Sequence, residues 1–205
     1  MASFHSIAGF HLVTGAVVIV GSAAAMISGC AADASRTTSS ESAAERARSQ
    51  AAFVEIAAVL RHPRCINCHT VTDFPRQGDA GRRHAQFVLR GPDNHGVPAM
   101  RCNSCHQDSN QENGVPGAPH WALAPLSMSW EGLDDNQLAE ALKDESKNGG
   151  RSLESLLDHM AHDPLVLWGW NPGGTREPVP VPHETFVRRL EEWMATGAVS
   201  PEPSP

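Results

Sequence analysis

Two short motifs of cysteine and histidine have the residue types and spacing that could carry chemistry in this sequence. RCINCHT places Cys65 and Cys68 three positions apart, with His69 directly after the second cysteine. RCNSCHQ, at 101–107, repeats the arrangement. Zinc sites, redox-active dithiols and covalently bound haem all use a C-x-x-C core. The histidine after each cysteine pair, together with the rest of the sequence, has to indicate which of these three kinds of site is present.

The full C-x-x-C-H string is typical of the attachment of c-type haem. Two thiols one helical turn apart add across the two vinyl groups, and the adjacent histidine is then held under the iron as its proximal ligand. We therefore expect two covalent haem c groups. The residues expected to attach them and to bind their irons are Cys65, Cys68, Cys102, Cys105, His69 and His106.

The fifth cysteine of the chain, Cys30, ends an apolar N-terminal stretch. Residues 1–30 contain no Asp, Glu, Lys or Arg, and the stretch is typical of an export signal. ISGC at 27–30 matches a bacterial lipobox, which predicts cleavage before Cys30 and its acylation; a plainly secreted form and an uncleaved anchor are the alternatives. The other four cysteines would then form two pairs, and an exported chain would not normally keep four free thiols.

Zinc and dithiol chemistry are the alternatives to haem at the two motifs. A zinc ribbon usually spaces its two C-x-x-C pairs by about 15–20 residues, whereas 33 residues separate the pairs here. Zinc also gives no reason for a histidine after both pairs. Thioredoxin-like chemistry expects a βαβ unit near its motif, and no such pattern is present. A zinc-stabilised adaptor lipoprotein stays open as an alternative.

The expected fold is mainly α, with short helices and long irregular loops packed around two haems. Apolar periodicity and capping residues predict four helices: from Gln50 into the first motif, from Asp134 or Asp135 to Lys143, over 151–162, and from His183 to a close at Gly197. The expected organisation is a signal peptide (1–30), a flexible tether (31–48), a di-haem domain (49–201) and a disordered tail (202–205).

Three side chains are candidates for the far face of an iron. His84 lies in the loop between the motifs, and Met128 lies in a proline-rich loop where a thioether ligand would suit an electron carrier. His159 flanks the apolar stripe of its predicted helix, in which Met160 is core and His162 lies on the opposite, solvated face. For each candidate, the alternative is an exposed side chain or one satisfied by hydrogen bonds.

The charge of the chain is unevenly distributed. Residues 61–101 have a net charge of +4 and residues 102–205 one of −10. Some of the arginines around the first motif are expected to pair with haem propionates and the others to be solvated: Arg61, Arg64, Arg76, Arg82, Arg83, Arg90 and Arg101. The acidic C-terminal half would suit a basic redox partner and is poorly suited to nucleic acid.

Several longer phrases, in order along the chain, carry a resemblance to a known family. They are HPRCINCHTVTDFPRQGD, LRGPDNHGVPAMRCNSCHQDSN, GVPGAPHWALAPLSMSWEG, LKDESKNGG, HMAHDPLVLWGWNPGGTREPVP and WMATGAVSP. Over residues 50–201 the chain resembles small bacterial di-haem cytochrome-like proteins that are often labelled "isoquinoline 1-oxidoreductase subunit".

The resemblance implies a partner and a missing crosslink. The label implies partnership with a molybdenum hydroxylase, whose electrons the cytochrome would pass onward. Nothing in this chain is similar to a molybdopterin or iron–sulfur subunit, so the label does not imply that this polypeptide performs the hydroxylation. Many members carry a cysteine pair near positions 139 and 200. Ala139 and Ser200 occupy them here, so a disulfide of its relatives would be absent.

The sequence therefore predicts a di-haem c-type cytochrome that is not itself an enzyme. We expect it to be periplasmic, tethered to a membrane by lipid at Cys30, and to pass single electrons between redox partners such as a molybdenum hydroxylase or another cytochrome. A haem enzyme of the peroxidase or oxidase type, with one open iron site, is the second alternative.

Overall fold

The computed structural model describes residues 28–203, and their side chains from residue 40 onward. The predicted signal peptide therefore lies outside the described residues except at its last three positions, and the side chain of Cys30, the predicted lipidation site, lies outside them too. The chain divides into two compact units, Met1–Ser40 and Glu41–Pro205. The second unit contains both motifs.

Helix α1 (Ser28–Leu60) contains the helix predicted from Gln50. It also runs through 31–48, where a flexible tether was expected. Residues 41–48 are exposed, and they consist mostly of Ala, Glu and Arg, which are strong helix formers. The backbone there is helical because of its local propensity, whereas Ser49 and the residues after it pack against other helices.

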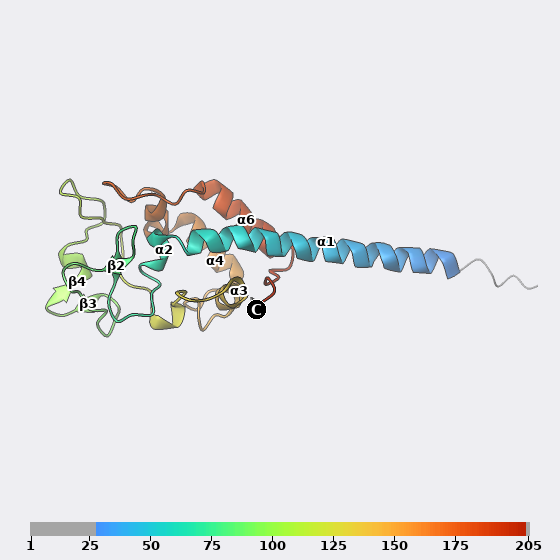
Figure 1. The fold of residues 1–205 in the computed structure, drawn as a ribbon, viewed down its shortest axis with the longest axis horizontal. Coiled ribbons are helices and arrows are strands. Elements are labelled where there is room, and N and C mark those ends of the chain that lie inside the picture. Colours follow the sequence, from blue (N-terminus) through green and yellow to red (C-terminus); the bar gives the residue numbers. More distant parts are fainter. Residues whose placement is uncertain (1–27, 204–205) are drawn as a thin grey trace, which may run out of the picture. The chain divides into compact units, whose positions relative to one another are not determined.

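The core of the second unit forms where α1 meets three C-terminal helices, α3 (Asp135–Lys143), α4 (Leu153–His162) and α6 (His183–Ala195). Figure 1 shows the end of α1 running beside α6, and the rings of Phe53 and Trp193 lie 5.0 Å apart between them. The largest fully buried side chains include Trp193, Phe53, Phe186, Ile56, Leu138, Leu142 and Leu190.

The capping signals predicted from the sequence are confirmed. Asp134 caps α3 in a reciprocal capping box with Gln137. Gly197, with φ of +93°, follows α6 and allows the left-handed turn that ends it. In α4, Met160 is buried and His162 is exposed, as the helical pattern predicted.

The region around the motifs is mostly irregular. It holds the short helix α2 (Pro63–Ile66) and two hairpins, β1 (Arg76–Gln77) with β2 (Arg82–Arg83) and β3 (Gly96–Val97) with β4 (Met100–Arg101). The single turns η1 (Cys102–Ser104), η2 (Leu126–Met128), α5 (Pro164–Leu167) and η3 (Trp168–Trp170) complete the fold. The regular structure of the described residues is mainly helical, with few and short strands, so the predicted mainly α class is confirmed.

Within residues 28–203, none of the helices combines the length and the apolar character that a membrane span requires.

Candidate functional site

The first motif lies on and directly after α2. His62 caps this helix, because its side chain accepts the Arg64 backbone N–H. The turn continues past Ile66, since the backbone N–H groups of Cys68 and His69 both donate to the carbonyl of Cys65. The two thiols and the imidazole therefore lie on consecutive turns, and both cysteines are free.

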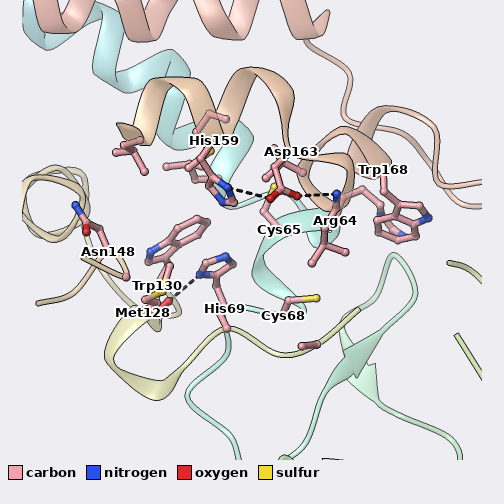
Figure 2. Close-up of a pocket in the computed structure, with 18 of the residues that line it drawn as sticks. Arg64, Cys65, Cys68, His69, Met128, Trp130, Asn148, His159, Asp163 and Trp168 are labelled. Carbon is pink, nitrogen blue, oxygen red and sulfur yellow. Dashed lines mark hydrogen bonds and ion pairs between the residues drawn. The ribbon is translucent and has the colours of Figure 1, made fainter. Parts of the chain in front are cut away.

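A cavity of about 370 Å³ opens beside this turn, and Cys65, Cys68 and His69 contribute to its lining. Its other walls come from the core helices, through apolar side chains that include Leu60, Leu142, Leu156, Met160 and Phe186. Figure 2 shows the motif side chains on one side of this cavity and α4 across from them. The volume is in the range of small-molecule and cofactor sites.

His69 is fixed on two sides. Its Nδ1 donates to the carbonyl oxygen of Met128 over 2.8 Å, and the ring of Trp130 stacks on it with centroids 3.4 Å apart and planes 9° apart. Burial lowers the pKa of His69 to about 4, so the imidazole is neutral at physiological pH. Since Nδ1 carries the proton, Nε2 keeps a free lone pair, which is the form that binds a metal.

His159 lines the same cavity from α4. Its Nδ1 lies 3.2 Å from Oδ2 of Asp163, and the other carboxylate oxygen accepts the Leu165 backbone N–H over 2.8 Å. The side chain of His159 is only 24 % exposed, and burial lowers its pKa. In Figure 2 the imidazoles of His159 and His69 point toward one another.

Met128 also contributes to the lining of this cavity. Its carbonyl oxygen lies beyond Nδ1 of His69, so Nε2, the other ring nitrogen, points away from the Met128 backbone. The structure thus brings two of the three predicted far-side candidates, Met128 and His159, to the cavity of the first motif.

The second motif repeats the environment of the first. Just after η1, the His106 backbone N–H donates to the Cys102 carbonyl over 2.9 Å. Nδ1 of His106 donates to the carbonyl oxygen of Pro116 over 2.7 Å, and the ring stacks on Trp121 with centroids 4.6 Å apart. The third far-side candidate, His84, lies 6.1 Å from His106 between ring centroids. Burial lowers the pKa of both histidines.

Aromatic side chains connect the two motifs. Trp121, which stacks on His106, also lines the first cavity. It meets Trp168 edge to face at 4.8 Å between centroids, and the indole N–H of Trp168 donates to Asn110, three residues past the second motif. Trp121 and Trp168 therefore form a wall that both motifs share.

The arginines around the first motif have different environments. Four pair with carboxylates: Arg61 with Asp135, Arg64 with Asp79, Arg76 with Glu131, and Arg101 with Asp93. Arg90 is buried and donates to backbone carbonyls, whereas Arg82 and Arg83 are exposed. Arg64 lines the cavity with its side chain only 2 % exposed, and its buried Nε has no hydrogen-bond partner within the described residues.

The pKa values and the arrangement of the thiols help to distinguish a redox-active dithiol and a zinc site from a haem site. Burial raises the pKa of Cys65 to about 12 and that of Cys68 to about 11. A redox-active dithiol needs the opposite, a thiolate stabilised at neutral pH. Among the side chains that the structure describes, no group of three or more His, Cys, Asp or Glu lies together in a way that could hold a metal ion.

The residues present fit a thioether-linked haem. Two free thiols and a neutral imidazole lie at the edge of an apolar, partly aromatic cavity. Arg64 lines the same cavity, and its buried Nε has no hydrogen-bond partner among the described residues. A haem propionate is one group that could satisfy such a nitrogen.

Sequence reasoning missed the supporting residues. Trp121, Trp130 and Pro116 were not singled out, because they reach the motif histidines by stacking and hydrogen bonds between residues far apart in the sequence, which leave no local pattern. Asp163 was also not singled out, although its i, i+4 spacing from His159 on a predicted helix is a signal that the sequence carries.

Comparisons of the chain with protein-family models, with curated proteins and with solved structures found no match.

Proposed function

We propose that this protein is a di-haem c-type cytochrome that carries single electrons between exported redox partners. The observation that carries the proposal is the shared environment of the two motif histidines. Each follows a free cysteine pair, donates Nδ1–H to a backbone carbonyl and stacks on a tryptophan. A haem iron held at each Nε2 would supply a one-electron redox centre.

The hydrogen bonds at Nδ1 explain how the chain would prepare each histidine as a ligand. A carbonyl oxygen can only accept, so it fixes the proton on Nδ1 and leaves Nε2 unprotonated. It also orients the ring and makes the imidazole more basic, as outer partners of metal-bound histidines commonly do. Trp130 and Trp121 limit rotation of the rings by stacking.

Electron transfer is favoured over haem enzymology because each motif has a second imidazole nearby. His159 faces the cavity of the first motif and His84 lies beside His106. An oxidase or peroxidase would need one iron with an open or displaceable far face. That enzyme function is the second candidate, and it requires at least one of these histidines to stay off the iron.

The proposed partners and location follow from the sequence. An export signal and acylation at Cys30 would place the protein in the periplasm, tethered to a membrane. Its acidic C-terminal half would favour a basic redox partner. The family resemblance suggests a molybdenum hydroxylase as electron donor, with another cytochrome as an alternative.

The absorption spectrum of the protein, exported in a host that matures c-type cytochromes, tests this proposal. The proposal expects a Soret band, two haems per chain in the pyridine haemochrome assay, and low-spin spectra in both oxidation states. High-spin features and reaction with peroxide would favour the enzyme. A colourless protein that contains zinc would favour the adaptor and contradict both haem functions.

A further inference from the structure

We propose that His159, oriented by Asp163, is the second axial ligand of the iron held by the first motif. This inference rests on the proposed function and deepens it, since it assigns both protein ligands at that site. It also makes Asp163 a positioning residue.

The contacts of His159 match those of a histidine prepared for a metal. Its Nδ1 lies 3.2 Å from Oδ2 of Asp163, and a proton on Nδ1 that faces this carboxylate would leave the lone pair on Nε2. Within the described residues Nε2 has no hydrogen-bond partner, although the side chain is mostly buried and lines the cavity. An unprotonated imidazole nitrogen is a common metal ligand, and the iron would be its partner.

Asp163 is itself held rigidly. It ends α4 and caps α5, because its Oδ1 accepts the Leu165 backbone N–H while Pro164 starts the new helix. The carboxylate thus has one oxygen fixed by the backbone and the other free for His159. A carboxylate behind a ligating histidine is a recurring outer-shell arrangement, and it raises the basicity of the ligand.

The two methionines that line the cavity are less suitable. The carbonyl oxygen of Met128 accepts the Nδ1–H of His69. The Met128 backbone therefore lies on the side of the His69 ring that is opposite to Nε2. Met160 is 5 % exposed and belongs to the hydrophobic core. His159 lies one residue before Met160 on α4 and differs from it in having a fixed polar partner.

A second histidine–carboxylate pair at the end of α4 offers a matched control. His162 and Asp158 form the same type of i, i+4 pair, with Nδ1 2.9 Å from Oδ1, but their side chains are 75 % and 80 % exposed and neither lines the first cavity. Replacing His162 therefore removes a histidine–carboxylate pair of the same spacing that lies outside the lining of the first cavity.

The experiment compares four variants of the exported di-haem protein by absorption, electron paramagnetic resonance and near-infrared magnetic circular dichroism. For His159→Gly we expect half of the low-spin haem signal to become high-spin, and added imidazole to restore it. For His162→Gly and Met128→Leu we expect unchanged spectra. For Asp163→Asn we expect both haems to stay low-spin while the potential of one haem rises, because the ligand becomes less basic.

Several results would overturn the inference. They are two low-spin haems in His159→Gly, a spin-state change in His162→Gly of the same size, or loss of a thioether charge-transfer band in Met128→Leu. Circular dichroism in the far ultraviolet verifies that α4 is intact in each variant. Absence of covalent haem from the unaltered protein would instead contradict the proposed function, so the two failures are distinguishable.

Discussion

The imidazole rings of His84 and His106 lie 6.1 Å apart between centroids, with their planes 77° apart. A metal–imidazole bond is about 2 Å long, so two imidazoles on opposite sides of one metal have centroids roughly 6 Å apart. The separation of this pair therefore matches the spacing that two imidazoles bound to one metal would need. The sequence did not indicate that these two histidines are close in space, because His106 follows His84 by 22 positions.

We predict that His84→Ala converts the haem of the second motif to a high-spin form and leaves the first haem unchanged. The reason is that His84 is the imidazole beside His106. Electron paramagnetic resonance of the oxidised protein measures this as loss of one of two low-spin signals. His95→Ala, which removes an exposed histidine of the same loop region, is the control. Two intact low-spin signals in His84→Ala would rule out this ligand.

Glu131 joins the loop after the first motif to the rest of the fold. It accepts hydrogen bonds from the Thr70 hydroxyl over 2.8 Å and the Val71 N–H over 3.3 Å, and it pairs with Arg76. Partial burial raises the pKa of Glu131, but these hydrogen bonds and the charge of Arg76 outweigh it and hold the pKa below the usual 4.5. The charged carboxylate therefore stabilises the folded state.

We predict that Glu131→Gln lowers the free energy of unfolding at pH 7 by about 1–2 kcal/mol. The pKa of the Glu131 carboxyl is lower in the folded state than in the unfolded state, where it is 4.5. The resulting stabilisation is fully present at a pH above the unfolded-state pKa, and it is lost as the pH falls through the folded-state pKa. The difference between variant and unaltered protein should therefore shrink below about pH 4, as urea unfolding at several pH values would measure. Glu112→Gln, at an exposed position, is the control; a pH-independent difference for Glu131→Gln would contradict the account.

Positions 139 and 200 lie on adjoining parts of the fold. Ala139 is fully buried in α3, and Ser200 donates from its hydroxyl to Glu140, the next residue of that helix. Asn136 and Gln50 hold the same C-terminal segment, because their side-chain amides donate to the backbone carbonyls of Pro201 and Ser200.

We predict that the double variant Ala139→Cys, Ser200→Cys forms a disulfide during export and raises the free energy of unfolding by about 2–4 kcal/mol, because a long loop of the unfolded chain is closed. Thermal unfolding with and without a reductant measures the gain, and the two single variants are the controls. If the thiols stayed free in the oxidising compartment, the inferred proximity of the two positions would be wrong.

The sequence predicted the helices well where local signals exist. Asp134 at the start of α3, the apolar stripe of α4 and Gly197 after α6 each act through neighbouring residues, so the boundaries could be located from spacing alone. The two hairpins were not predicted, because strands of two residues are too short to show an alternating pattern. Residues 31–48 were predicted to be a flexible tether because of their low complexity, whereas α1 runs through them.

The cysteines and histidines of the candidate site could be named from the sequence, whereas the residues around them could not. The cysteines and histidines of the motifs are set by a local string. The carbonyls of Met128 and Pro116 and the rings of Trp130 and Trp121 reach the motifs only through the tertiary fold. For the same reason, the sequence could name His84, Met128 and His159 as far-side candidates but could not assign them to one motif or the other.

The mass of the mature protein tests the central claim most directly. After export in a host that attaches c-type haem, the account predicts an intact mass that exceeds the polypeptide by two haem groups. Replacing Cys65 and Cys68 by serine should remove one of them, and replacing Cys102 and Cys105 should remove the other. A mature chain without any such mass increase, from cells that attach haem to a control cytochrome, would contradict the account.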